Sequence, residues 1–337
     1  MTAIEIRALR RDEVSAWVAH CMHVFKHTDA MYFESHLHDD AAALIDMRNI
    51  LVAVDTDDAI CASVRVVPRH QFVGGRVVSM GGIAEVSTKE AHRGKGLASR
   101  LLRAAIAGPL ASFDLSVLHT NFARLGRFYG QHGWQSVEFK NVRVQLSRPP
   151  SSSLPPSISI APLDIHAYAD EILALYHTVS ADFNGPLLRT VPYVQEWIAA
   201  RHRRNHMHAV GAWNGPRLVA YIFGKAVVEA ETSPAAPGDD TIVLHVDELI
   251  VPGRRSLGSP PLADDDRAVV AHHLLAHLAS SSTAASMDAI LPLPVAINLS
   301  LVATPDPLIT VDRGWMFRNV ASFVDAKLNV MWDTDGF

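Results

Sequence analysis

An early stretch of the chain consists of short apolar runs separated by polar turns. Ile50–Val54 and Ala59–Pro68 are such runs, and the acidic segment Asp55–Asp58 joins them. The pair Gly74-Gly75 stands between two further short runs and is typical of a tight hairpin turn. Gly82–Thr88 is again a largely apolar run of strand length. The pattern therefore predicts an antiparallel meander.

Downstream of the meander, helical and strand periodicities alternate. The apolar residues of Gly96–Ile106 fall on one helical face, and Leu125–His132 predicts a second, shorter helix. Leu115–Thr120 predicts a strand between them, and Gln135–Leu146 predicts a return strand. A meander followed by this order of elements indicates an α+β fold.

A stretch rich in proline and serine, residues 148–157, has neither helical nor strand periodicity and predicts a linker. We therefore expect one domain at 1–147 and another at 158–337. The second half repeats the order of the first in outline, with a hairpin across Asn214–Pro216 and a helix at Asp264–Ser280. This repetition suggests two copies of one fold.

Composition narrows the class of protein. The 337 residues are 49% hydrophobic and 19% charged, which is enough apolar content for a large core. The net charge of −5 gives no general attraction to nucleic acid. The two cysteines, Cys21 and Cys61, favour a reducing compartment. Neither a signal peptide nor a membrane-length apolar run is evident, so we expect a soluble, cytoplasmic protein.

The segment Gly82–Ser99 carries the clearest chemical signal. A strand leads into a glycine-bearing turn, and the turn opens a helix whose free N–H groups and dipole suit a pyrophosphate. Gly94 and Gly96 allow phosphates to approach the backbone, and Arg93 adds a fork of charged donors. An isolated Gly-x-Gly is nevertheless most often an ordinary surface turn.

A dinucleotide-binding turn and a coenzyme A turn are the two functional alternatives. The first requires a third glycine, where this chain has Ser99. Asp114 stands twenty residues after Gly94, but it precedes its strand, whereas a ribose-binding acid follows one. The segment also follows several strands of a meander instead of opening the chain. These features favour coenzyme A.

Two motifs resemble the GNAT superfamily of N-acetyltransferases. Arg93–Ala98 after a strand matches its pyrophosphate loop, and Tyr129 four residues before Gly133-Trp134 matches its second signature. The spacing and the degenerate second half, including His245–Leu249 and Asp312–Val320, resemble the enhanced intracellular survival (Eis) group. That group usually carries a third, sterol-carrier-like domain, for which this chain is too short.

The resemblance implies tandem GNAT folds, each a mixed, mostly antiparallel sheet flanked by helices, with the second copy degenerate. It also implies acetyl-CoA as co-substrate, held between two splayed strands, and direct attack by an amine without a metal or a covalent enzyme intermediate. The cofactor-binding residues that it implies are Val86, Ser87, Thr88, Arg93, Gly94, Lys95, Gly96, Leu97, Ala98, Ser99 and Asn121. We expect no coenzyme in the second half, which would complete the substrate pocket.

Two proton transfers need side chains. Tyr129 is the candidate general acid, since a phenol stays protonated at neutral pH and can protonate the leaving thiolate. Its structural alternative is a packed aromatic residue. Glu85, beside the expected thioester, is one candidate base, with an ordinary ion pair as the alternative. The resemblance implies the terminal carboxylate of Phe337 as a second candidate base, with a frayed C-terminal tail as the structural alternative. Water is the third candidate base.

The main alternative to an enzyme is a non-catalytic acyl-CoA-binding or scaffold protein, which would need the loop but not Tyr129. Clustered histidines such as His273 and His277 lack the further ligands of a recognised zinc motif, so we expect no metal. The sequence leaves open whether the acceptor is a small amine or a lysine side chain. The physiological acyl group and the formation of homo-oligomers are open as well.

Overall fold

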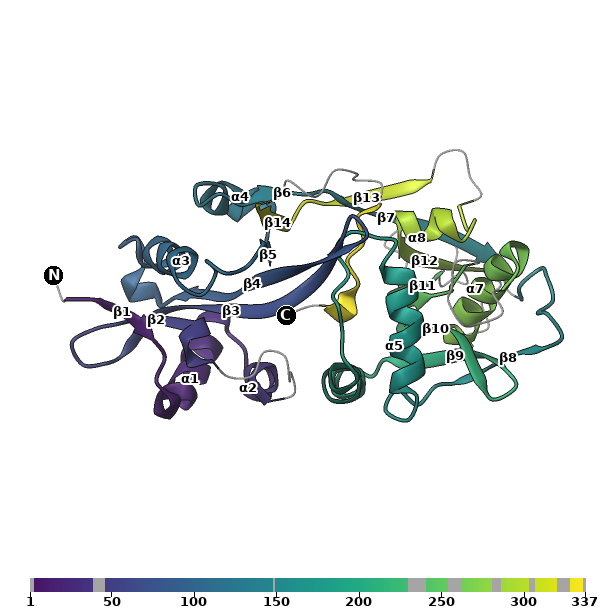
Figure 1. Ribbon diagram of the computed structural model, residues 1–337, viewed down its shortest axis with the longest axis horizontal. Coiled ribbons are helices and arrows are strands. Elements are labelled where there is room, and N and C mark those ends of the chain that lie inside the picture. The colour runs from purple at the N-terminus through teal and green to yellow at the C-terminus, as the bar shows by residue number, and fades with distance from the viewer. Residues whose placement is uncertain are drawn as a thin grey trace.

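The computed structural model describes residues 3–38, 46–147, 149–229, 241–253, 262–280, 286–302, 307–319 and 328–335. Within them the chain forms two seven-stranded mixed sheets with helices packed on them (Figure 1). This confirms the predicted α+β class and the tandem arrangement. Among the described helices, none has the length and apolar character needed to span a membrane.

The first sheet is antiparallel except for one parallel pair, β4–β5. Its strands, in spatial order, are β1 (Glu5–Ala8), β2 (Ile50–Val54), β3 (Ile60–Val73), β4 (Arg76–Thr88), β5 (Leu115–His119), β14 (Trp315–Arg318) and β6 (Gln135–Ser136). Its helices are α1 (Val14–Phe25), α2 (Met31–His38), α3 (Leu97–Ala107) and α4 (Phe122–Gly130).

The second sheet repeats this plan with one parallel pair, β11–β12. Its strands are β8 (Ile158–Pro162), β9 (His208–Asn214), β10 (Arg217–Glu229), β11 (Thr241–Ile250), β12 (Ser286–Pro292), β7 (Phe139–Ser147) and β13 (Leu308–Asp312). Its helices are α5 (Ala169–Ser180), a π-helical turn (Tyr193–Ile198) running into α6 (Ala199–Arg204), α7 (Asp264–Leu278) and α8 (Leu293–Asn298).

Each half of the chain contributes one strand to the sheet of the other half: β7 lies in the second sheet and β14 in the first. The predicted return strand Gln135–Leu146 is wrong as a single element, because it divides into β6 in the first sheet and β7 in the second. The corresponding place in the first sheet is taken by β14, which comes from the second half of the sequence. The predicted linker at 148–157 lies between β7 and β8, which both belong to the second sheet, so the chain passes from the first sheet to the second before this segment.

The β2 strand shows why its sequence is apolar throughout. Ile50, Val52 and Val54 pack in one cluster with α1 and α2, whereas Leu51 and Ala53 pack in another with α3. Alternate side chains of a strand point to opposite faces of the sheet. Helices on both faces thus bury every position of β2. If apolar and polar residues alternated along β2, the polar side chains would be buried against one of the two layers of helices.

The end of the β3–β4 hairpin attaches the first half to the second. Phe72 N–H donates to the Pro186 carbonyl at 2.9 Å, and Gly185 N–H donates to the Phe72 carbonyl at 2.8 Å. Nearby, an apolar cluster that includes Met80, Phe139 and Phe317 spans the two sheets. The predicted turn at Gly74-Gly75 is confirmed, with both residues at positive φ.

Several elements differ from the sequence-based expectations. The helix α2 and the strand β1 are present although no periodicity indicated them. The predicted loop Glu231–Asp240 lies outside the described residues, and Pro252–Asp266 lies within them only in part. The predicted strands Ala59–Pro68 and Gly82–Thr88 are parts of the longer strands β3 and β4, which run on to the turn at Gly74-Gly75. The remaining predicted helices and strands agree with the structure to within a few residues at their ends.

Candidate active site

The strands β4 and β5 separate where the sequence predicted a coenzyme. Their parallel pairing covers only Met80–Gly82 of β4, opposite Leu115–Val117. From Ile83 onward β4 pairs with β3 alone. The edge of β4 that pairs with β5 up to Gly82 has no further pairing with that strand. A bulge at this point gives Glu85 a φ of 44°, which is uncommon for a residue other than glycine. The splayed edge offers backbone N–H and C=O groups to an extended ligand.

The loop after β4 has the geometry of an anion site. Gly94 and Gly96 have φ values of 74° and 70°, which glycine adopts without strain. The first helical hydrogen bond runs from Arg100 N–H to the Gly96 carbonyl at 3.0 Å. Within the described hydrogen bonds, the N–H groups of residues 94–99 have no acceptor, and they gather at the positive end of α3.

The side chains around this loop take different positions. Arg93 and Lys95 are exposed, and Arg93 Nε donates to the Thr88 carbonyl at 3.4 Å. Ser87 is buried, with its hydroxyl 2.9 Å from Nε2 of His20, so only its backbone can serve a ligand on the splayed edge. Leu97 is in the core, whereas Ala98 and Ser99 are half-buried. Asn121 caps α4 by accepting from Arg124 N–H at 3.1 Å.

A cavity of about 730 Å³ opens beside the splayed strands. Its near wall consists of Ile83–Val86 from β4, Leu118 and His119 from β5 with the following Thr120, and Tyr129 from α4. Residues from α1, α2 and the loop between them form a second wall. The far wall comes from the second half, with Arg201, Asp312, Trp315, Trp332 and Asp333. Both halves of the chain therefore build one cavity.

Tyr129 lies at this cavity although most of its ring is in the core. It contacts Phe128 and Trp134 edge-on, with ring centroids 5.1 and 6.4 Å apart. Burial raises the pKa of Tyr129 to about 12. The phenol is therefore protonated at any physiological pH, as a proton donor must be.

Glu85 also lines the cavity, but its carboxylate forms a buried ion pair. Arg65 donates to it through Nε at 2.5 Å and through Nη2 at 3.0 Å. Burial raises the pKa of Glu85, but the charge and hydrogen bonds of Arg65 outweigh it, so the pKa is lowered. A carboxylate held in this way is a weaker base than a free one.

A histidine of the near wall meets an aspartate of the far wall. Nε2 of His119, at the end of β5, lies 3.0 Å from Oδ2 of Asp312. The other carboxylate oxygen accepts from Gly314 N–H at 2.6 Å, and the His119 ring packs against Trp315 at 4.8 Å. Burial raises the pKa of Asp312, but the hydrogen bonds from His119 and Gly314 together with the charge of His119 outweigh it, so the pKa is lowered. An ionised Asp312 holds Nε2–H and leaves Nδ1 as the basic nitrogen.

Sequence reasoning missed this pair because it depends on the exchanged strand. The pairing of β14 with β5 sets Trp315 opposite His119 and so brings Asp312 within reach. The segment Asp312–Val320 resembled the second domain of the Eis group, but its contact with the first sheet has no local signal. The aromatic and acidic residues around Gly314 were the only available indication.

Phe337 lies outside the described residues, so its suggested role stays a prediction. The chain just before it contributes Trp332 and Asp333 to the cavity. A fully buried network fixes this segment: Arg189 donates to Asp335 at 2.8 Å and to Glu248 at 2.6 Å. The end of the described chain is thus anchored in the second core.

The second half also has a parallel pair that stops early. Pairing between β11 and β12 ends at His245 and Ile290. A smaller cavity of about 110 Å³ lies there and shares Asp312, Trp315, Trp332 and Asp333 with the larger one. Burial, followed by the charge of Asp333, raises the pKa of Asp247 in its wall to about 6. The segment after β11, where a coenzyme loop would begin, lies largely outside the described residues.

The class of protein follows from these features together with a family match. Residues 5–137 match the family model described as an acetyltransferase (GNAT) domain. The chain therefore contains a GNAT acetyltransferase domain, and its second sheet repeats the same strand plan. A search of curated protein sequences finds no significant match.

Solved structures share this tandem fold at low sequence identity. A GCN5-related N-acetyltransferase from Kribbella flavida is 20% identical, with a TM-score of 0.66, over 95% of this chain and 72% of that one. Eis1 from Mycobacterium abscessus is 14% identical, with a TM-score of 0.62, over 94% and 73%. Saccharomyces cerevisiae N-myristoyltransferase, solved with myristoyl-CoA, is 9% identical, with a TM-score of 0.57, over 95% and 83%. At these identities the likeness concerns the fold.

Proposed function

We propose that the protein transfers an acetyl group from acetyl-CoA to a primary amine. The observation that carries this proposal is the splay of β4 from β5 between a loop with free N–H groups and a cavity containing Tyr129. The pantetheine arm would pair with the free edge of β4 at Val86–Thr88, and the pyrophosphate would lie over residues 93–99. A backbone N–H of the β4 edge would polarise the thioester carbonyl.

Tyr129 acts as the general acid in this scheme. The amine nitrogen attacks the thioester carbon, the C–S bond breaks, and the phenol delivers its proton to the departing sulfur. The raised pKa favours a phenol that is protonated at the start of each cycle. The phenolate then recovers its proton from solvent or from the attacking nitrogen, which loses its extra proton as the neutral amide forms.

His119 is our choice for the group that deprotonates the amine. Its partner Asp312 is ionised and orients the ring, as in other histidine bases. The His119 side chain is 52% exposed at the cavity, so Nδ1 can take the proton directly or through a water. The carboxylates of Asp312 and Asp333, in the far wall of the cavity, also attract a protonated amine toward His119. Glu85 and Phe337 stay alternative bases.

A thiol-release assay with acetyl-CoA and a panel of amines tests the proposal. We expect Tyr129→Phe to lower kcat by about 10²–10⁴-fold, the range for loss of a general acid, with coenzyme binding retained. Tyr168→Phe is the matched control, because Tyr168 packs on Trp213 in the second half. Coenzyme binding without turnover on any amine would instead support the non-catalytic acyl-CoA-binding or scaffold protein.

A further inference from the structure

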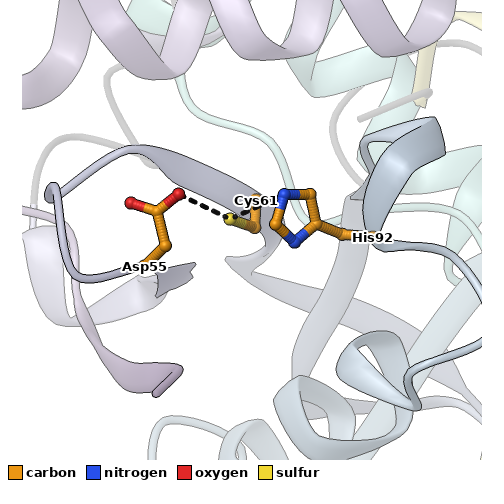
Figure 2. A group of neighbouring side chains, drawn as sticks. All are labelled: Asp55, Cys61 and His92. Atoms are coloured by element: carbon orange, nitrogen blue, oxygen red, sulfur yellow. Dashed lines mark hydrogen bonds between the residues drawn. The ribbon is translucent and has the colours of Figure 1, made fainter. Parts of the chain in front are cut away.

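Three side chains with metal-binding atoms converge outside the cavity. Asp55 comes from the turn between β2 and β3, Cys61 from the start of β3, and His92 from the turn before Arg93 (Figure 2). Their carboxylate oxygen, sulfur and imidazole nitrogen all lie within 4.8 Å of one another. Cys61 is buried, while Asp55 and His92 are half-buried, so the cluster is open to solvent on one side.

The two distances from the Cys61 sulfur are close to those between ligands around one zinc ion. Cys61 Sγ is 3.6 Å from His92 Nε2 and 3.8 Å from Asp55 Oδ2. Zinc bonds of about 2.3 Å to sulfur and about 2.0–2.1 Å to nitrogen or oxygen, set at a tetrahedral angle, separate the ligand atoms by about 3.6 Å. The three side chains would need little movement to meet a common ion.

The contacts of the Cys61 thiol are weak as hydrogen bonds, because sulfur is a weak donor and a weak acceptor. Its polar neighbours are Asp55 Oδ2, the Ala59 carbonyl at 3.4 Å and His92 Nε2, which donates or accepts according to its tautomer. Nδ1 of His92 is buried and has no partner among the described residues, so the ring's polar contact is through Nε2. A cation would replace these weak contacts with bonds to the carboxylate oxygen, the thiolate sulfur and the imidazole nitrogen.

The surrounding backbone holds the ligands in place. Asp55 Oδ1 accepts from Asp57 N–H at 3.1 Å and from Ala59 N–H at 3.0 Å, which leaves Oδ2 directed at the sulfur. Lys89 N–H donates to the Cys61 carbonyl at 2.9 Å and so fixes the turn that bears His92. Outer hydrogen bonds of this kind orient metal ligands.

We infer that Asp55, Cys61 and His92 bind one zinc ion, with water as the fourth ligand. The mixed sulfur, nitrogen and oxygen set suits zinc and disfavours magnesium or calcium, which take oxygen ligands. On binding, the Cys61 thiol gives its proton to water and the thiolate bonds the metal. The ion joins the β2–β3 turn to the turn before Arg93, and so stiffens the start of the anion-binding loop. This inference does not depend on the proposed reaction.

Titration of the reduced full-length chain with Co²⁺ tests the site, because a bound thiolate gives a charge-transfer band. We expect one Co²⁺ per chain, displaced by Zn²⁺, and no such band in Cys61→Ser. His92→Ala should weaken binding by at least about tenfold, the loss found even for outer-shell groups. Cys21→Ala is the matched control, since Cys21 is the other cysteine and is buried within α1, away from the cluster.

A second measurement separates metal binding from folding defects. At the same Zn²⁺ concentration, the Tm of His92→Ala should rise less than that of the native chain and of Cys21→Ala. Far-UV circular dichroism confirms that each variant is folded. Failure to bind one equivalent, or a charge-transfer band that persists in Cys61→Ser, would overturn the assignment. Loss of the band in Cys21→Ala would mean that Cys21 is the metal ligand, and it would also overturn the assignment.

Discussion

Gly314 lies where any side chain would disturb the His119–Asp312 pair. A Cβ at this position would stand 2.5 Å from the Thr120 carbonyl oxygen, 2.6 Å from His119 Nε2 and 3.0 Å from Asp312 Oδ1. The first contact is with backbone, and the Gly314 carbonyl accepts from Thr120 N–H at 3.0 Å, which fixes the two segments together. Gly314→Ala must therefore push the His119 ring away from its carboxylate.

The size of the effect follows from these distances. Ordinary carbon–oxygen contacts exceed 3 Å, so the atoms must separate by about 0.5–1 Å, and such overpacking costs about 1–3 kcal/mol of unfolding free energy. Misplacing a reacting group by about 1 Å can lower the rate about 10²-fold. We expect a loss of kcat of that order and an unchanged KM for acetyl-CoA, because the anion-binding loop is not touched.

Urea denaturation gives the stability and steady-state thiol release gives kcat, each on the native chain and the variant. Gly130→Ala is the control, because nothing lies within 4 Å of a Cβ built there. If Gly314→Ala loses stability but retains the native kcat, the His119–Asp312 pair takes no part in the reaction. If Gly130→Ala loses as much activity as Gly314→Ala, the steric reasoning is wrong.

Three further outcomes are expected. Arg93→Ala should weaken coenzyme binding by about 10–100-fold in calorimetry, because a charged hydrogen bond to phosphate is lost, whereas exposed Arg203→Ala should leave it unchanged. Arg189→Met should lower the free energy of unfolding by about 3–5 kcal/mol in urea denaturation, because the buried Glu248 and Asp335 lose their counter-charge; a smaller loss would mean that the network is dispensable. Burial lowers the pKa of His202 from 6.5 to about 4, so the unfolded chain binds more protons below pH 6.5 and stability should fall by about 3 kcal/mol between pH 6.5 and 4. His202→Phe should flatten that part of the pH–stability profile, and an unchanged slope would assign the loss to other groups.

Local sequence determined much of the first half. Apolar runs and the Gly74-Gly75 turn specified β2, β3 and the start of β4, because a strand buried on both faces needs an unbroken apolar sequence. The glycines at 94 and 96 are likewise explained by the backbone, because both positions have a positive φ, which glycine adopts with less strain than other residues. The pyrophosphate loop and Tyr129 could therefore be proposed from short motifs alone.

Only the tertiary structure decided which way the Glu85 side chain points and that it pairs with Arg65. Arg65 pairs with Ala84 across the β3–β4 ladder, so in a regular strand Glu85 would point to the opposite face. The bulge at Glu85 changes its direction and allows the ion pair with Arg65. A periodicity of two cannot reveal a bulge, because one extra residue reverses every later side chain.

The far wall of the cavity could not be predicted from the sequence either. The exchange of β7 and β14 between sheets brings His119 to Asp312 across a separation of 193 residues. No local propensity encodes which sheet a short strand joins, since both sheets present an edge of the same kind. The sequence thus determined the loop, the strand and the tyrosine of the candidate site, while only the packing of the two halves supplied its histidine and aspartate.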